Sequence, residues 1–276
     1  CDDLSDDDSL SIIREFQDPR IIVLTNATRL GLFSNVNRLM THARGIYLRV
    51  LCQDDFLYPE ALAEEKAFFE SHPDVGMVLS KSKTISETGA VLAEATLNDL
   101  PDRLFTPLAM QHYFYHGCIP GNLSGAAFKR STVDEVGEFD PHFRVSGDYE
   151  MWVRICERFP MGLLHRHVVA VRFHPNQLSR RKSSGVLFVR ENREIRKRAW
   201  RNLPAELRGK ARRYERIRHG TLEFHCAIRS LLAGRIQDFF SFCRILNPKE
   251  LFFSLFYWFV TLNNRLYYPQ ATWIVP

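Results

Sequence analysis

The first 180 residues alternate between short apolar or β-branched runs and segments whose apolar residues recur at helical spacing. Short apolar runs that are bounded by polar or turn residues are typical of buried strands. We predict such strands over residues 20–24, 46–52, 75–80 and 167–174. Because helical segments separate these runs, the pattern indicates an α/β fold with an open sheet.

The predicted helices are marked by apolar spacing together with start and stop residues. The segment after Gly31 has apolar residues on one helical face, and Gly45 suits the end of that helix. Pro59 stands where a further helix begins, because proline is favoured in a first helical turn. We predict three more helices over residues 105–115, 131–136 and 148–158.

The pattern changes after residue 183, where helical spacing continues without further strand-like runs. We therefore predict a catalytic-type domain over residues 1–182 and a helical C-terminal region over residues 183–276. Residues 180–218 hold fifteen Lys or Arg against four Asp or Glu. Such a basic segment attracts phosphates, anionic lipids or nucleic acid, although it is equally consistent with a solvated helix face.

Residues 251–260 are strongly apolar, but the run is too short to span a bilayer, which requires about twenty residues. The run therefore either lies in a membrane interface or covers the core of the domain. The six cysteines include no C-x-x-C pair, which argues against a zinc or redox site and favours a reducing compartment. We expect a cytoplasmic protein with peripheral contact to the inner face of the cell membrane.

Adjacent carboxylates at Asp54 and Asp55 follow one predicted strand and precede a predicted helix. Ligands of open α/β sheets bind at the carboxyl ends of strands, and oxygen ligands suit a hard divalent cation. The alternative is a solvated acidic loop. His174 ends another predicted strand and is placed to contact a metal or phosphate, although a lone histidine is often structural.

Two further acidic positions are candidates for binding and catalysis. Asp2 and Asp3 suit recognition of a nucleobase or ribose, because carboxylates accept hydrogen bonds from N–H and O–H groups. Asp148 opens a predicted helix, whose amide groups and dipole favour its ionised form. A carboxylate held in this way can act as a general base towards an alcohol. The alternatives are a flexible acidic start and an ordinary helix cap.

The order of these motifs resembles that of the family 2 glycosyltransferases of the GT-A fold, over about residues 1–180. The resemblance rests on DDLSD at residues 2–6, on Gly31, Asn37, Ala43, Gly45 and Tyr47, on LCQDDFLYPE, on ISETGAVL, on GNLSGAAFKRSTVDEVGEFDP, on GDYEMW and on the R-F-H element that ends at His174. It implies a GT-A-like open mixed sheet flanked by helices, with a Rossmann-like nucleotide-binding half.

The sequence departs from the family pattern at three places. Cys52 stands where the metal motif usually has its first Asp, and Gly147 replaces the usual Glu before the base. The family also begins with a strand, helix and strand that precede the DDxSxD motif, and these are not found here. We therefore expect residues 1–276 by themselves to fold poorly.

The resemblance implies an inverting transfer from a UDP- or dTDP-sugar to a saccharide or lipid-linked hydroxyl, in polysaccharide or glycan synthesis. Asp148 would be the general base, and Mg²⁺ or Mn²⁺ would bind at the metal residues. The resemblance also implies residues that bind each ligand: for the donor nucleotide Asp2, Asp3, Asn37 and Asp54, for the metal Asp54, Asp55 and His174, and for the acceptor Asn122, Ser124 and Glu150.

Three other functions are consistent with parts of the sequence. A degenerate relative that binds nucleotide sugar without turnover would explain Cys52 and Gly147. A nucleic-acid binder could use the basic residues 180–218, but that segment matches no binding motif, so no nucleic-acid partner is expected. A nucleotidyltransferase would share the fold class and an acidic metal site.

Overall fold

The computed structural model describes residues 1–94, 100–118, 122–174, 177–178 and 184–246, together with residues 252 and 255. The chain divides into two compact units. The first unit comprises Cys1–Ala109 and His116–His174, and the C-terminal unit comprises Met110–Tyr115 and Pro175–Pro276. The domain boundary predicted at residues 182 and 183 lies between described segments, at positions the structure does not describe.

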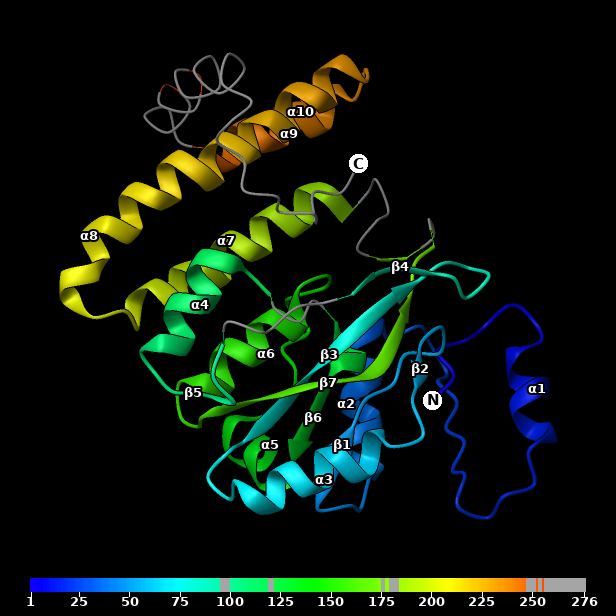
Figure 1. The fold of residues 1–276 in the computed structure, drawn as a ribbon. Helices are drawn as coiled ribbons and strands as arrows, with labels where there is room; N and C mark the ends of the chain where they lie inside the picture. Colours follow the sequence, from blue (N-terminus) through cyan, green and yellow to red (C-terminus); the bar gives the residue numbers. More distant parts are fainter. Residues whose placement is uncertain are drawn as a thin grey trace. The chain divides into compact units, whose positions relative to one another are not determined.

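The first unit is built on a seven-stranded sheet of order β1-β6-β3-β7-β2, with β4 paired to β3 and β5 to β7. The strands are β1 (Tyr47–Arg49), β2 (Phe56–Leu57), β3 (Met77–Ile85), β4 (Val91–Glu94), β5 (Arg103–Leu104), β6 (Ala126–Lys129) and β7 (Met161–Arg172). Only β3 and β7 pair in parallel, and they run side by side through the unit (Figure 1). The sheet is therefore mixed, as predicted.

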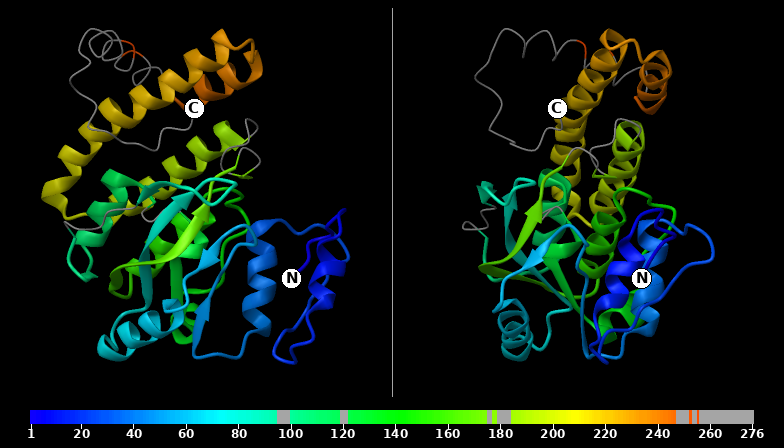
Figure 2. Two further views of the ribbon diagram at one scale, coloured as in Figure 1. Left: turned by 45° about the vertical axis from the view of Figure 1, so that its right-hand side comes forward. Right: turned by 90° about the vertical axis from the view of Figure 1, so that its right-hand side faces the viewer.

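Helices flank this sheet at most of the positions that the apolar spacing predicts. The helices of this part of the chain are α1 (Ser9–Glu15), α2 (Leu32–His42), α3 (Ala61–Ser71), α4 (Leu108–His116), α5 (Arg130–Val136) and α6 (Gly147–Cys156), with the short 3₁₀ helix η1 (Leu123–Gly125). Helix α1 was not predicted. In both views of Figure 2 it lies with the N-terminal segment at one side of the unit, outside the sheet.

The core of the first unit forms where α6 packs on the sheet. Trp152 is fully buried, and its ring centroid lies 5.3 Å from that of Phe128 and 6.1 Å from that of Phe139. Residues 77–80 of β3 are buried in succession, as expected of a strand that is covered on both faces. These contacts fix α6, and with it Asp148, relative to the sheet.

The predicted strand over residues 20–24 is wrong. Ile21, Ile22 and Val23 are exposed, Ile22 by 63%. Among the described residues, this region pairs only through a single parallel bridge between Asp2 and Thr25. The β-branched composition favours an extended backbone, but a strand also needs a hydrogen-bonding neighbour along its length.

The other predicted strands are correct in position but not in extent. The strand predicted at 46–52 is regular only over β1, since residues 50–52 pair with no neighbouring strand in the described part of the chain, and the chain turns at residues 53 and 54. The strand predicted at 167–174 is the second half of β7, which begins at Met161. Its first half was missed because Gly162, His165 and Arg166 interrupt the apolar run.

The C-terminal unit contains α7 (Gly185–Arg201), α8 (Ala205–Tyr214), α9 (Gly220–Leu232) and α10 (Ile236–Ile245), and a π-helical turn, η4 (Glu215–His219), joins α8 to α9. The buried Arg196 guanidinium forms ion pairs with Glu215 at 3.1 Å and with Glu223 at 2.9 Å. These pairs tie α7 to the chain that continues through η4 into α9. A helical C-terminal region is therefore confirmed.

The described residues contain no helix that is both long enough and apolar enough to cross a bilayer. The apolar run at 251–260, for which an interfacial or core-covering role is predicted, lies outside the described residues except at positions 252 and 255.

Candidate active site

The acidic turn, residues 52–55, connects β1 to β2 at one end of the sheet. It is closed by the Asp55 amide, which donates to the Cys52 carbonyl oxygen at 3.1 Å. The fully buried Ser124 of η1 also holds the turn, because the Ser124 Oγ accepts a hydrogen bond from the Cys52 amide at 2.9 Å. The backbone of the turn is thus held by its own hydrogen bond and by a buried hydroxyl group.

The end of β7 fixes both carboxylates of the acidic turn. The Arg172 amide donates to Asp55 Oδ1 at 2.9 Å, and the Arg172 side chain donates to the Asp54 carbonyl oxygen at 3.2 Å. His174 Nε2 lies 3.0 Å from Asp54 Oδ2. The sheet therefore brings residues that are about 120 positions apart in sequence into one cluster.

Potential ligand atoms of Cys52, Asp54 and Asp55 all lie within 4.8 Å of one another. Two carboxylates and a thiol at this separation fit a single divalent cation, so the donor set agrees with the metal that the family resemblance implies. His174 is not part of this group. Its imidazole contacts Asp54 instead, an arrangement that orients a metal-binding carboxylate.

The electrostatics of the acidic turn favour a positive charge. Burial raises the pKa of Asp55, and the neighbouring Asp54 adds to the effect, although hydrogen bonds from Ser124 and Arg172 partly offset it. Burial, with smaller contributions from nearby carboxylates, raises the pKa of the Cys52 thiol to about 11. A bound cation would reverse this penalty on negative charge.

Asp148 is the second residue of α6, and its Oδ1 accepts a hydrogen bond from the Tyr149 amide at 2.8 Å. After burial and the carboxylates of the acidic turn, its charge makes a small contribution to the raised pKa of the Cys52 thiol, so the two groups interact electrostatically. The preceding residue, Gly147, lies against the Phe33 ring. A Cβ atom at position 147 would lie 2.7 Å from that ring. The family's usual Glu has no room at this position.

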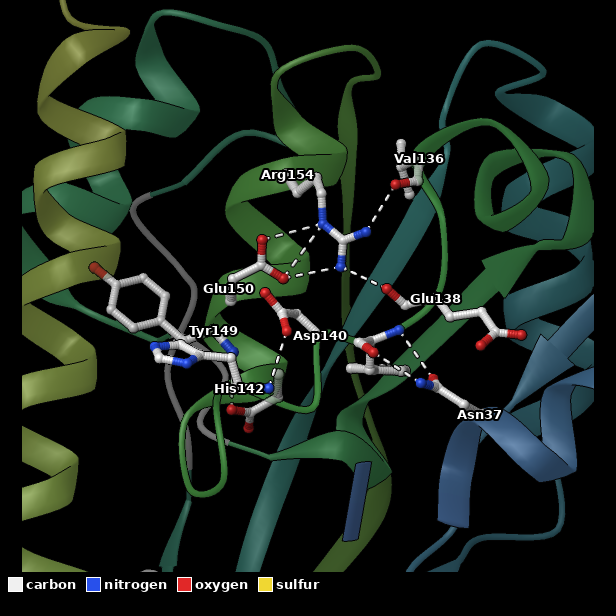
Figure 3. Close-up of polar contacts among 10 residues, drawn as sticks. Asn37, Val136, Glu138, Asp140, His142, Tyr149, Glu150 and Arg154 are labelled. Atoms are coloured by element: carbon white, nitrogen blue, oxygen red, sulfur yellow. Dashed lines mark hydrogen bonds and ion pairs between the residues drawn. The ribbon is translucent and has the colours of Figure 1, made fainter. Parts of the chain in front are cut away.

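Glu150, predicted to contact the acceptor, is buried in a structural ion pair (Figure 3). Its Oε2 lies 2.8 Å from Arg154 Nη2, and Arg154 also donates to the carbonyl oxygens of Val136 and Glu138. The position one helical turn before Arg154 explains this pairing, since residues i and i+4 meet on a helix surface. We therefore give Glu150 a structural role.

Asn37, predicted to bind the donor nucleotide, instead joins α2 to the loop before α6 (Figure 3). Its Nδ2 donates to the Phe139 carbonyl oxygen at 2.7 Å, and its Oδ1 accepts from the Phe139 amide at 2.9 Å. Because the side chain is buried and both of its polar atoms are hydrogen-bonded to the backbone of Phe139, these contacts hold α2 against that loop.

The other two predicted acceptor residues, Asn122 and Ser124, support the acidic turn. Asn122 Oδ1 caps η1 by accepting from the Gly125 amide at 2.8 Å. Ser124 is fully buried and hydrogen-bonds to the side chain of Asp55 as well as to the Cys52 amide. These contacts position the turn, and they leave Ser124 inaccessible to an acceptor.

Asp2, predicted to bind the nucleotide, is buried beside the segment that ends at Thr25. Its two carboxylate oxygens accept from the Ser5 amide at 3.3 and 3.4 Å. Long bonds to a single donor leave lone pairs on both oxygens unused.

Asp3, also predicted to bind the nucleotide, holds the loop that leads into α2. It accepts hydrogen bonds from the amides of Leu30 and Gly31 at 2.7 and 2.9 Å, and from Asn26 Nδ2 at 2.7 Å. Partial burial alone would raise its pKa, but these hydrogen bonds outweigh burial and lower it.

One buried network next to the site was not predicted. Arg49 of β1 forms an ion pair with Glu65 of α3 at 3.1 Å, and Ser80 of β3 donates to the same carboxylate at 3.2 Å. The signal in the sequence was a charged residue at the centre of a short predicted strand. The network anchors β1 three residues before the acidic turn begins.

Comparisons with known proteins support the family resemblance and the fold. Residues 1–119 match the sequence model of Glycosyl transferase family 2. The structure of Staphylococcus aureus TarS 1–349 in complex with UDP superimposes with a TM-score of 0.60 at 14% identity, covering 96% of this chain and 80% of that one. The GT-A fold and the predicted relationship to family 2 glycosyltransferases are thereby confirmed.

Two similar proteins are named as glycosyltransferases. An uncharacterised glycosyltransferase of Methanocaldococcus jannaschii, MJ1057, is 26% identical over 62% of this chain and 58% of its own length. The putative glycosyltransferase EpsE of Bacillus subtilis is 33% identical over 26% of this chain and 27% of its own. This chain thus spans little more than half the length of the first of these relatives.

Proposed function

We propose that this chain is the catalytic part of an inverting glycosyltransferase that moves a sugar from a nucleoside-diphosphate sugar to a hydroxyl acceptor. The observation that supports the proposal is the convergence of ligand atoms of Cys52, Asp54 and Asp55 within 4.8 Å of one another, together with the electrostatic effect of Asp148 on the Cys52 thiol. Carboxylates that bind a cation beside a carboxylate that accepts a proton suit transfer between a charged donor and an alcohol.

The acidic turn is proposed to face the diphosphate of the donor. Asp54 and Asp55 would hold Mg²⁺ or Mn²⁺, which when bound neutralises charge on the leaving diphosphate. His174 and Arg172 keep these carboxylates in place through the contacts described above. Structures of TarS contain UDP and UDP-GlcNAc, which supports a UDP- or dTDP-sugar as the donor class here.

The nucleoside is proposed to lie against the N-terminal segment. Asp3 is the more exposed of its two candidate carboxylates. A carboxylate offers about four acceptor sites, so Asp3 can bind a ribose hydroxyl or base N–H in addition to its loop contacts.

Asp148 is proposed to remove the acceptor hydroxyl proton. As the acceptor oxygen bonds to the anomeric carbon, that proton passes to Asp148 and the bond to the diphosphate oxygen breaks, which inverts the anomeric centre. The helix N-terminus and the Tyr149 amide favour the ionised carboxylate that this step needs. We propose a saccharide or lipid-linked acceptor in polysaccharide synthesis at the membrane surface. The basic side chains of α7 and α8 are consistent with this setting.

Calorimetric titration of UDP and dTDP, with and without Mn²⁺, tests the donor site. Native protein is compared with Asp54→Ala/Asp55→Ala and with Asp134→Ala/Glu135→Ala, which removes an adjacent exposed acidic pair on α5. We expect Mn²⁺-dependent nucleotide binding in the native protein and in the α5 control, and its loss in the site variant.

Equal binding by all three proteins would contradict the proposed donor site. Folded native protein that binds nucleotide but transfers no sugar would favour the degenerate alternative, for which Cys52 and Gly147 are the sequence evidence. A transfer assay run beside the titration separates these outcomes.

A further inference from the structure

The acidic turn contains a sulfur atom that the proposed function does not use. Cys52 Sγ belongs to the same group of convergent ligand atoms as the carboxylates of Asp54 and Asp55, with all of them within 4.8 Å of one another. The convergence follows from the backbone, since the hydrogen bond from Asp55 to the Cys52 carbonyl closes the turn and places residues 52, 54 and 55 around one centre.

Two ordinary roles of cysteine do not account for Cys52. It forms no disulfide, and none of the other five cysteines is disulfide-bonded. It is also not a core residue: Cys156 of α6 is 1% exposed and packs as a small hydrophobe, whereas Cys52 is partly exposed at the surface of the site. A partly exposed thiol among carboxylates is instead an available metal ligand.

We infer that Cys52 is the third protein ligand of the cation, and that its sulfur makes the site favour Co²⁺, Zn²⁺ and Cd²⁺ over Mg²⁺. Mg²⁺ requires a nearly ideal octahedron of oxygen ligands, whereas thiolates select softer ions. As the metal–sulfur bond forms, the S–H bond breaks and its proton is released to solvent. The inference rests on the proposed function only in that a cation binds at this turn.

Titration of the metal-free chain with Co²⁺ and Cd²⁺ tests the inference through absorption. Thiolate ligation produces a sulfur-to-metal charge-transfer band in the near ultraviolet, which oxygen ligands do not. We expect the band in native protein and in Cys243→Ser, a matched variant that removes a partly exposed thiol in the C-terminal unit. We expect it to vanish in Cys52→Ser and in Asp54→Ala/Asp55→Ala.

A second variant, Cys52→Asp, supplies an all-oxygen donor set at the same turn. We expect its affinity for Cd²⁺ relative to Mg²⁺ to fall about tenfold or more, by competition titration, while circular dichroism shows an unchanged fold. This readout does not depend on transferase activity.

The outcomes separate this inference from the proposed function. A band that persists in Cys52→Ser, or metal binding through Asp54 and Asp55 without any band, would overturn the role of sulfur and leave the donor site intact. Absence of all metal binding in native protein would overturn it as well, and nucleotide titration without metal would then decide the proposed function separately.

Discussion

Asp3 and Asp55 are aspartates in the same unit of the molecule, yet the fold shifts the pKa values of their carboxyl groups in opposite directions. Three hydrogen-bond donors from the loop before α2 surround Asp3, and its pKa is lowered. Burial beside another carboxylate raises the pKa of Asp55. The fold therefore stabilises the charged form of Asp3, whereas it disfavours the charge on Asp55, a penalty that a bound cation would relieve.

The same contrast recurs within α6. Glu150 is buried against Arg154, and its charge is neutralised inside the fold. Asp148, two residues earlier, contributes instead to the raised pKa of the Cys52 thiol. The comparison teaches that an acidic motif contains carboxylates of two kinds, and that only their surroundings distinguish a structural carboxylate from a functional one.

The largest expected effect is on turnover. Asp148→Asn should lower the transfer rate by about 10²- to 10⁴-fold, the usual contribution of a general base, because the amide cannot accept the acceptor proton. Nucleotide affinity should stay near the native value, as calorimetry would show. Near-native turnover of Asp148→Asn would mean that another group accepts the proton.

The next largest effect concerns stability. Glu150→Ala should lower the free energy of unfolding by about 3 kcal/mol, because it leaves the Arg154 guanidinium partly buried without its carboxylate. Urea denaturation measures the change. If Glu150→Ala lowered the free energy of unfolding only as little as loss of an exposed ion pair does, such as that of Arg158 with Glu135, the pair of Glu150 with Arg154 would not stabilise the fold.

A smaller effect should distinguish Asp3 from Asp55. Asp3→Asn should lower the free energy of unfolding by about 1 kcal/mol, because an amide cannot replace a carboxylate that accepts from Leu30, Gly31 and Asn26. Asp55→Asn should leave metal-free stability unchanged or raise it, since it removes a charge that burial penalises. Equal losses of unfolding free energy in Asp3→Asn and Asp55→Asn would contradict the proposed difference between the two carboxylates.

The smallest expected effect is the pH dependence of the stability changes caused by Asp3→Asn and Asp55→Asn. The pKa of Asp3 is lowered in the folded state, so its stabilising contribution is present above the unfolded carboxyl pKa and is lost as pH falls through the folded value. The pKa of Asp55 is raised, so the native protein should lose stability relative to Asp55→Asn as pH rises from the unfolded to the folded value. Denaturation series from neutral pH to below about 4, without metal, should show opposite trends.

The sequence by itself determined the elements with strong local signals. Apolar spacing predicted α2, α3 and α6, and the run before residue 52 predicted β1 followed by the acidic turn. These signals are local, since amphipathic spacing and turn residues reflect the conformation of the segment that contains them. The order of the motifs also predicted the GT-A fold, which the structural comparison confirms, and the resemblance to family 2 glycosyltransferases, whose model matches residues 1–119.

Only the tertiary structure decided which polar residues are free for chemistry. Asn37 and Phe139 are 102 positions apart, and no local pattern indicates that they are hydrogen-bonded to each other. The exposed run at 20–24 has the composition of a strand, yet its pairing depends on neighbours in space. The residue type determines which hydrogen bonds and charges a side chain can offer. Burial and long-range partners decide whether a ligand can reach those groups, because a side chain that is already hydrogen-bonded must give up one partner to bind another.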